Sequence, residues 1–319
     1  MTEILAFPLT MAAALWAVHG LLRAGVHEGV AVFGVLVASI GAIAALERLA
    51  PYRAGWNRSD GDVGTDFAHM LVAQSLIPRL LGPLWPALAA SMTAALAAAF
   101  GARLWPHDWP ILAQLFLVLV IAEFGRYWFH RAAHEIPLLW RLHAVHHSPG
   151  RLYWLNAGRF HPLEKVIFLI PEALPFAVLG AGPEVMAMYF VFNGVHGLFQ
   201  HSNIRVRLGP LNYLFSMTEL HRWHHSKIIA ESNTNYGNNL ILWDLVFGTF
   251  FLPKDREVGT IGLLNPAYPK GYLAQLAAPF ARGRLDKPED FDARRAYYED
   301  ALRAEADAAR AAFAGERAC

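Results

Sequence analysis

The chain has 319 residues, of which 55% are hydrophobic and only 17% charged, and its mean hydropathy is +0.29. In soluble domains about a quarter of the residues are charged, so this composition indicates a membrane-embedded protein. The net charge of +1 gives no reason to expect a nucleic-acid partner, and the single cysteine, Cys319, excludes disulfides, thiolate zinc sites and iron–sulfur clusters.

The amino-terminal third consists of apolar runs separated by short polar loops. Ile4–Leu22 and Gly29–Leu46 are each long enough to span a bilayer as a helix. Asp66–Leu81 is apolar but interrupted by polar residues and a proline, which indicates a helix at the interface or buried against its neighbours. Trp85–Phe100 is alanine-rich and predicts a further span where the bilayer thins.

The middle of the chain continues this pattern. Trp109–Phe124 predicts a span whose helix continues beyond the membrane until Pro137 interrupts it. Leu163–Leu179 and Val185–Phe199 form another apolar pair, and Asn233–Leu252 is apolar enough to reach the interface but too polar to span. We therefore predict an all-α bundle of about four to six spans, with six favoured, over residues 1–281. Residues 282–319 predict a charged, amphipathic terminal helix.

Basic residues indicate the orientation of this bundle. Arginines occur in the loop after the second predicted span, and ten arginines and lysines flank the histidine-rich segments described below. Because basic loops remain on the cytoplasmic side, we expect those segments to form a cap on the cytoplasmic face of a multi-pass membrane protein.

Histidines are concentrated in three blocks with helical spacing, within residues 127–252. The blocks read HRAAH at 130–134, HAVHH at 143–147 and HRWHH at 221–225. Residues three and four apart lie on one face of a helix, so each block directs two or three imidazoles toward a common point. Neutral imidazole binds iron, zinc and copper, and this many buried imidazoles without a metal would be costly. The spacing thus predicts a histidine-rich site for two metals.

The motifs that are missing narrow the chemistry. The chain has no HExxH, GxSxG, Walker or GxGxxG sequence. A zinc hydrolase needs only three protein ligands, and a bis-histidine haem needs opposed histidines on separate membrane helices. Two redox-active irons fit the blocks better, because iron binds dioxygen and imidazole ligands survive oxidising chemistry.

These blocks, in this order and spacing, resemble the eight-histidine signature of the fatty acid hydroxylase/sterol desaturase superfamily. RFHPLE around His161, FQHSN around His201 and the stretch NYGNNLILWDLVFGTFF support the resemblance, which covers roughly residues 47–252. It implies a non-haem di-iron site, in which zinc can replace iron in a structure. The ligands it implies are His130, His134, His143, His146, His147, His221, His224 and His225, with His161 and His201 as additional ligands.

Acidic and amide side chains near the blocks are candidates for orienting the imidazoles. Glu135 and Asp244 are the residues that we assign to catalysis, with ion pairing to a nearby arginine as the alternative role. Further candidates for hydrogen bonds to the histidines are Glu164, Glu219, Asn156, Arg159, Asn203 and Asn233.

The predicted function is therefore hydroxylation, or else desaturation, of a lipid C–H bond with dioxygen. The lipid substrate enters from the bilayer, and electrons come from a separate reductase, ferredoxin-like protein or small cytochrome. One alternative within the superfamily is an ether-lipid-cleaving monooxygenase that uses a pterin. An alternative of another class is a metal-binding or electron-transfer membrane protein without oxygenase activity.

Overall fold

The structure, a computed structural model, describes residues 2–100 and 104–281. Apart from three isolated β-bridges, the regular structure of these residues is helical, which confirms the all-α prediction. The predicted terminal helix at 282–319 lies outside the described residues, and the domain boundary at 281 stays a prediction. The longer helices are α1 (Thr2–Arg23), α2 (Glu28–Leu49), α5 (Leu84–Phe100), α6 (Ile111–Glu135), α7 (Pro137–His147), α8 (Pro162–Leu179) and α9 (Pro183–His201).

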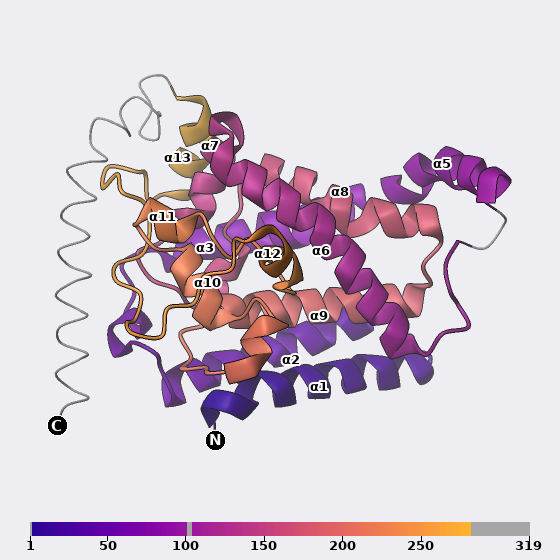
Figure 1. Cartoon of the computed structure of the whole chain (residues 1–319), viewed down its shortest axis with the longest axis horizontal. Helices are drawn as coiled ribbons and strands as arrows, with labels where there is room; N and C mark the ends of the chain where they lie inside the picture. The colour runs from indigo at the N-terminus through magenta and orange to yellow at the C-terminus, as the bar shows by residue number, and fades with distance from the viewer. Residues whose placement is uncertain (1, 101–103, 282–319) are drawn as a thin grey trace.

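The remaining helices are short and lie mostly at one end of the bundle (Figure 1). They are η1 (Ala54–Asn57), α3 (Val63–His69), the π-helix η2 (Met70–Leu76), α4 (Ile77–Leu81), η3 (Trp154–Gly158), η4 (Gly209–Tyr213), α10 (Thr218–His224), α11 (Ile229–Ser232), α12 (Leu242–Phe247), α13 (Tyr272–Ala277) and η5 (Ala278–Phe280).

Helices α1, α2 and α9 run side by side and form one layer of the bundle (Figure 1). In α2 the buried residues follow a spacing of four, from Ala31 through Val35, Ser39 and Ile43 to Glu47, while most of the remaining surface is exposed and apolar. A narrow buried stripe with an apolar remainder is what a helix needs when lipid, not water, covers its outer side. This layer therefore holds α9 in place, and α9 carries His201 at its end.

Helix α6 crosses the bundle and delivers the first histidine block. Its 25 residues are about 38 Å long, more than a bilayer core requires. It ends at Glu135, and α7 begins at Pro137, whose ring cannot continue the preceding helix. The predicted extension of this helix to the histidines and its break at Pro137 are confirmed.

Helix α8 packs against α6 and α5, and its contact with α6 is unusually close. A Cβ atom on Gly125 of α6 would lie 2.6 Å from the Cβ of Pro171 in α8. Only glycine fits this crossing, so the backbone of α6 at Gly125 contacts the side chain of Pro171 in α8 directly.

Three helices, α1, α2 and α6, are long and apolar enough to cross a membrane. The pair formed by Val63–Leu81 and Leu84–Phe100, bent by 47°, is a fourth candidate. The described residues thus support three or four spans; four is the lower limit of the expected range of four to six, and three lies below it. Helices α8 and α9, which the pattern paired as spans, are not among the candidates; α8 carries Glu164, Lys165 and Glu172 within its length.

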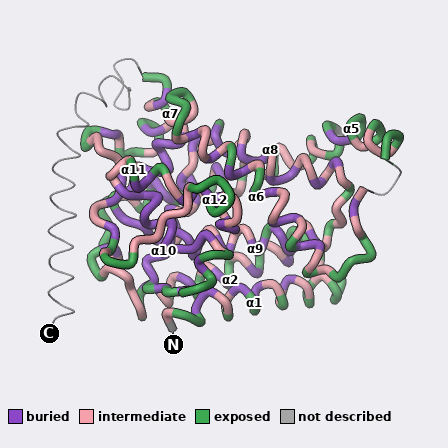
Figure 2. The backbone as a smooth tube through the Cα atoms, viewed as in Figure 1, coloured by how far each residue is buried: buried purple, intermediate pink, exposed green. Residues whose placement is uncertain are grey.

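Burial is greatest where the short helices gather, and α5 is largely exposed (Figure 2). The buried end contains α7, α10 and the carboxyl ends of α6 and α9, all of which carry histidines. The buried histidines of the described residues are therefore concentrated at this end of the bundle.

Candidate metal centre

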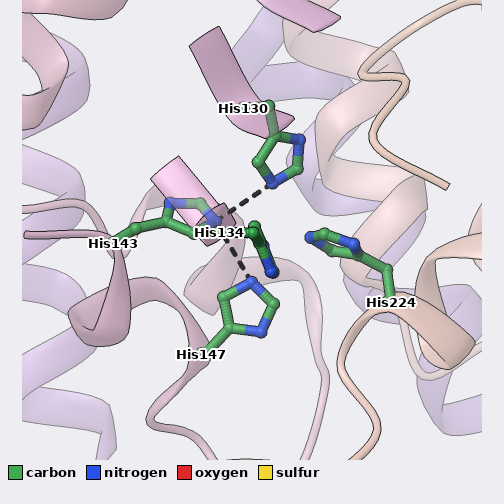
Figure 3. A group of neighbouring side chains, drawn as sticks. All are labelled: His130, His134, His143, His147 and His224. Carbon is green, nitrogen blue, oxygen red and sulfur yellow. Dashed lines mark hydrogen bonds between the residues drawn. The ribbon is translucent and has the colours of Figure 1, made fainter. Parts of the chain in front are cut away.

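Nine histidines form two groups at the buried end of the bundle. The first group contains His130, His134, His143, His147 and His224, and the second contains His146, His201, His221 and His225. Each histidine of a group offers one ring nitrogen, and the nitrogens offered within a group all lie within 4.8 Å of one another. Figure 3 shows the five rings of the first group turned toward a common centre.

Helices α7 and α10 each contribute to both groups, in opposite ways. In α7, His143 and His147 belong to the first group and His146 to the second. In the segment of α10 and its carboxyl cap, His221 and His225 belong to the second group and His224 to the first. At 3.6 residues per turn, residue i+4 lies about 40° to one side of residue i around the helix axis, and residue i+3 lies about 60° to its other side. The HxxHH spacing thus places one helix between two sites.

The ring nitrogens within each group are in close contact. His143 Nε2 lies 3.0 Å from His130 Nε2 and 3.1 Å from His147 Nε2. In the second group, His221 Nε2 lies 2.9 Å from His201 Nε2 and 3.0 Å from His225 Nε2. His143 and His221 are therefore the central histidines of their groups.

Most of these rings are oriented by acceptors that bind the opposite nitrogen. The Nδ1 atoms of five histidines donate to oxygen atoms, three of them backbone carbonyls. The pairs are His130 with Tyr236 O at 2.7 Å, His146 with Arg159 O at 3.2 Å, His224 with Thr234 O at 2.8 Å, His201 with Asn156 Oδ1 at 2.9 Å and His134 with Asn233 Oδ1 at 3.1 Å. His143 Nδ1 binds the carboxylate of Glu164. These contacts place the proton on Nδ1 and direct the Nε2 lone pair into the group.

This arrangement fits metal binding and is unfavourable without it. His130 and His143 both donate from Nδ1, so their Nε2 lone pairs face each other at 3.0 Å, a repulsive contact unless a cation lies between them. The Nε2 atoms of His134 and His224 are buried without a hydrogen-bond partner in the described chain. Unsatisfied buried lone pairs cost free energy that a metal ion would recover.

Electrostatics keep the imidazoles neutral, the form that binds metals. Burial lowers the pKa of His146 to about 3 and that of His224 to about 4. For His143, His147 and His225, burial and then the charges of neighbouring histidines hold the pKa well below its usual value. The rings are therefore available as ligands at neutral pH.

His161, predicted as an additional ligand, lies outside both groups. Its Nδ1 accepts a hydrogen bond from Leu163 N at 3.2 Å, which caps the start of α8, and its Nε2 contacts Leu276 O at 3.2 Å. Both nitrogens are thus used in structural contacts. His201, predicted with the same support, does lie in the second group.

The two acidic residues assigned to catalysis occupy different environments, neither among the ligand atoms. Glu135 is half-exposed and pairs with Arg131 at 2.8 Å, one turn away on α6. Asp244 is buried and accepts hydrogen bonds from Tyr236 N at 2.8 Å, Gly237 N at 2.7 Å and Thr249 Oγ1 at 2.6 Å. Burial raises the pKa of Asp244 to about 6, although these donors oppose the shift. Asp244 thus holds the loop whose carbonyl orients His130.

Several buried acids with structural roles near the site were not predicted from the sequence. Glu123 accepts hydrogen bonds from three consecutive backbone amides of the loop at 238–240. Glu47 accepts from Trp154 N at 2.7 Å and Asn203 N at 2.9 Å, and Asp66 binds Arg159 and Tyr153. The signal available was a lone acidic residue within an apolar run, which usually has a buried partner. Of the other candidates, Glu219 instead binds Leu208 N, and Asn203 binds Arg53.

Fold and site together define a helical membrane protein with two adjacent groups of histidines at one end of its bundle, each of which could hold a metal ion. The fatty acid hydroxylase family model matches residues 115–249. The ornithine lipid hydroxylase OlsE of Rhizobium tropici is 41% identical over 281 residues, which are 87% of this chain and 84% of the relative. The chain therefore belongs to the fatty acid hydroxylase family and is an oxidoreductase, as the resemblance implied.

More distant relatives share only part of the chain. Human alkylglycerol monooxygenase is 32% identical over 167 residues, 51% of this chain and 36% of that protein. The very-long-chain aldehyde decarbonylase GL1-8 of Oryza sativa subsp. indica is 27% identical over 146 residues, 45% of this chain and 54% of that protein. No solved structure matches the chain.

Proposed function

We propose that the chain is a membrane-embedded di-iron oxygenase that hydroxylates a C–H bond of a membrane lipid. The observation that carries this proposal is the pair of adjacent groups of buried imidazoles, with nitrogen lone pairs facing one another at about 3 Å. A single metal cannot use nine imidazoles in two separate groups. Iron in both groups would supply dioxygen activation, the chemistry needed to oxidise an unactivated C–H bond.

The chain's own residues hold, orient and shield such a site. The nine histidines of the two groups are the proposed ligands. Glu164, Asn156, Asn233 and the carbonyls of Thr234 and Tyr236 fix the tautomers. All nine rings except the partly exposed His134 are buried, so bulk water has little access to the proposed oxidation chemistry.

The proposed substrate is a polar acylated lipid of the ornithine lipid type. This choice rests on the 41% identity with an ornithine lipid hydroxylase along most of both chains. The reaction consumes dioxygen, two electrons and two protons and yields the alcohol and water. We propose that the electrons come from a separate donor, a reductase, ferredoxin-like protein or small cytochrome.

We further propose that the histidine end faces the cytoplasm, where reduced carriers are available. The arginines of 126–159 and the loop after α2 support this orientation.

The test is hydroxylation of ornithine lipid by purified, iron-loaded protein in lipid nanodiscs with a ferredoxin, its reductase and isotopically labelled dioxygen. We expect one labelled oxygen atom in the lipid, and no product from His224→Ala protein that still inserts in membranes. Product without the label refutes an oxygenase. Loss of two hydrogens without oxygen incorporation would instead establish desaturation. Metal binding with no lipid oxidation under any donor would leave a non-catalytic metal-binding or electron-transfer protein.

The alternative activity, cleavage of an ether lipid with a pterin as reductant, is favoured only by the 32% identity with alkylglycerol monooxygenase. It predicts an aldehyde product from alkylglycerol that depends on reduced pterin. Aldehyde formation without hydroxylation of ornithine lipid would replace the proposed function with this one.

A further inference from the structure

Exposed apolar side chains form a stripe along the outer side of α6. Leu112, Phe116, Phe124 and Trp128 are spaced by four or eight residues, so they share one side of the helix, and they are 63%, 53%, 45% and 42% exposed. Because α6 is one of the candidate spans, we expect lipid acyl chains to cover this stripe. The stripe ends two residues before His130, at the level of the first histidine group.

Helix α12 continues the same surface beyond the end of the stripe. Leu245, Val246 and Phe247 are 40%, 58% and 36% exposed, although α12 is only six residues long and too short to span. Its rings pack on the stripe: Trp243 lies 4.8 Å from Phe124, and Phe247 lies 4.9 Å from Trp128, between ring centroids. In Figure 1, α12 lies over α6 at this point.

The opposite side of α12 is polar and is connected to the first group. Asp244 points inward and binds the backbone amides of Tyr236 and Gly237, and the carbonyl of Tyr236 orients His130. Only two layers of aromatic rings separate the exposed surface from the histidines. Phe247 stacks on Tyr127 at 5.3 Å, Tyr127 lies 5.9 Å from Tyr236, and Tyr236 lies 5.3 Å from His134.

We infer that α12 and the end of the α6 stripe form a lipid-docking surface: α12 lies in the acyl-chain region of the bilayer just below the head groups. Three consecutive exposed apolar side chains on a short helix are poorly suited to water, and they are continuous with the apolar surface of a candidate span. The substrate chain approaches the first histidine group across this surface, a consequence that rests on the proposed function.

The position of α12 can be measured without any activity, because the chain has a single native cysteine. In a Cys319→Ser background, nitroxide labels are placed at Val246→Cys, at Phe116→Cys within the α6 stripe, and at Lys254→Cys, an exposed charged position. Power-saturation electron paramagnetic resonance in phosphatidylcholine vesicles then compares collisions with dioxygen and with a water-soluble nickel chelate. We expect position 246 to favour dioxygen, as position 116 does, and position 254 to favour nickel.

Two outcomes overturn the inference. Nickel accessibility at position 246 equal to that at 254 would place α12 in water. Protection from both reagents would show that a second copy or another protein covers it.

The second arm compares Val246→Asp with Val246→Leu. Both should retain the wild-type metal content, while Val246→Asp raises KM for lipid substrate about tenfold in vesicles. Equal KM values for the two variants would remove the proposed substrate approach. Absence of hydroxylation in all variants would refute the proposed function and leave the measured depth of α12 standing.

Discussion

The two groups differ at their central histidines, and this difference predicts unequal metal affinity. His143 Nδ1 binds the buried carboxylate of Glu164, whereas His221 Nδ1 is buried with no partner in the part of the chain described. A carboxylate bound to a ligand histidine raises its basicity and fixes its orientation, and removing such a partner costs about 10–100-fold in metal affinity. That factor corresponds to about 1.4–2.7 kcal/mol.

Glu164→Gln should therefore weaken the first group by this amount while leaving the second group unchanged. The amide oxygen still accepts from His143 Nδ1, so geometry is kept and charge is removed. Zinc is a suitable probe, because it binds nitrogen ligands and has no redox chemistry. Protein loaded with zinc is titrated with a chelator, and metal per chain is measured by elemental mass spectrometry.

We expect wild type to lose zinc in two steps, first from the weaker second group and then from the first group. In Glu164→Gln the first group should lose its zinc at a lower chelator concentration, so the two steps move closer together. Glu135→Gln is the matched control, because Glu135 is half-exposed and paired with Arg131. If zinc loss from the first group were unchanged in Glu164→Gln, the role given to the carboxylate would be refuted. An equal shift in Glu135→Gln would show that charge alone, not contact with His143, sets the affinity.

Four further outcomes are expected from the geometry and the proposed orientation. His161→Ala should keep two metals per chain and lower stability by about 1 kcal/mol through loss of the α8 cap, and loss of metal would place His161 among the ligands. Asp244→Asn should lower the melting temperature and metal retention, because the amide NH₂ of the new side chain would face the N–H of Gly237 in place of an acceptor oxygen. Losing this hydrogen bond should lower the free energy of unfolding by about 1–3 kcal/mol. Gly125→Ala should destabilise by about 1–3 kcal/mol because its Cβ would meet Pro171. Gly20→Ala should not, because its Cβ would meet no atom of a packed neighbour within 4 Å in the described chain, and equal melting temperatures would contradict the close packing. Reporter fusions after Arg58 and Arg159 should give a cytoplasmic signal and fusions after Arg103 an external one, and an external Arg159 would refute the proposed electron supply.

Sequence periodicity was sufficient for the helices and for most of the histidines. The i, i+4 spacing identified histidines that belong to one group, whereas the i+3 histidine of each HxxHH block belongs to the other group. Pro137 marked the end of α6. Spacing did not reveal that one HxxHH block serves two groups, because that depends on where α6 and α9 pass α7 and α10. His161 and His201 had the same support from the family resemblance, and the packing of the chain is what makes one a helix cap and the other a member of the second group.

Hydropathy was less informative about which helices span. Helix α8 is apolar in its overall pattern, yet it buries Glu164, Lys165 and Glu172 against neighbouring helices. An apolar pattern alone does not distinguish such a buried helix from a lipid-facing one, and the three charged residues are what set α8 apart from the candidate spans. The acids Glu47 and Glu123 likewise gain their roles from loops far away in the chain.

The sharing of α7 and α10 between the two groups has a mechanical consequence. An ion in the first group and an ion in the second would fix each helix at two points about one turn apart. A change in the charge of one ion would alter its bond lengths to the histidine nitrogens. That change would tilt a helix that also carries ligands of the second ion. The backbone itself would connect the two metals. A spectroscopic signal from one group should therefore shift when only a ligand of the other is replaced.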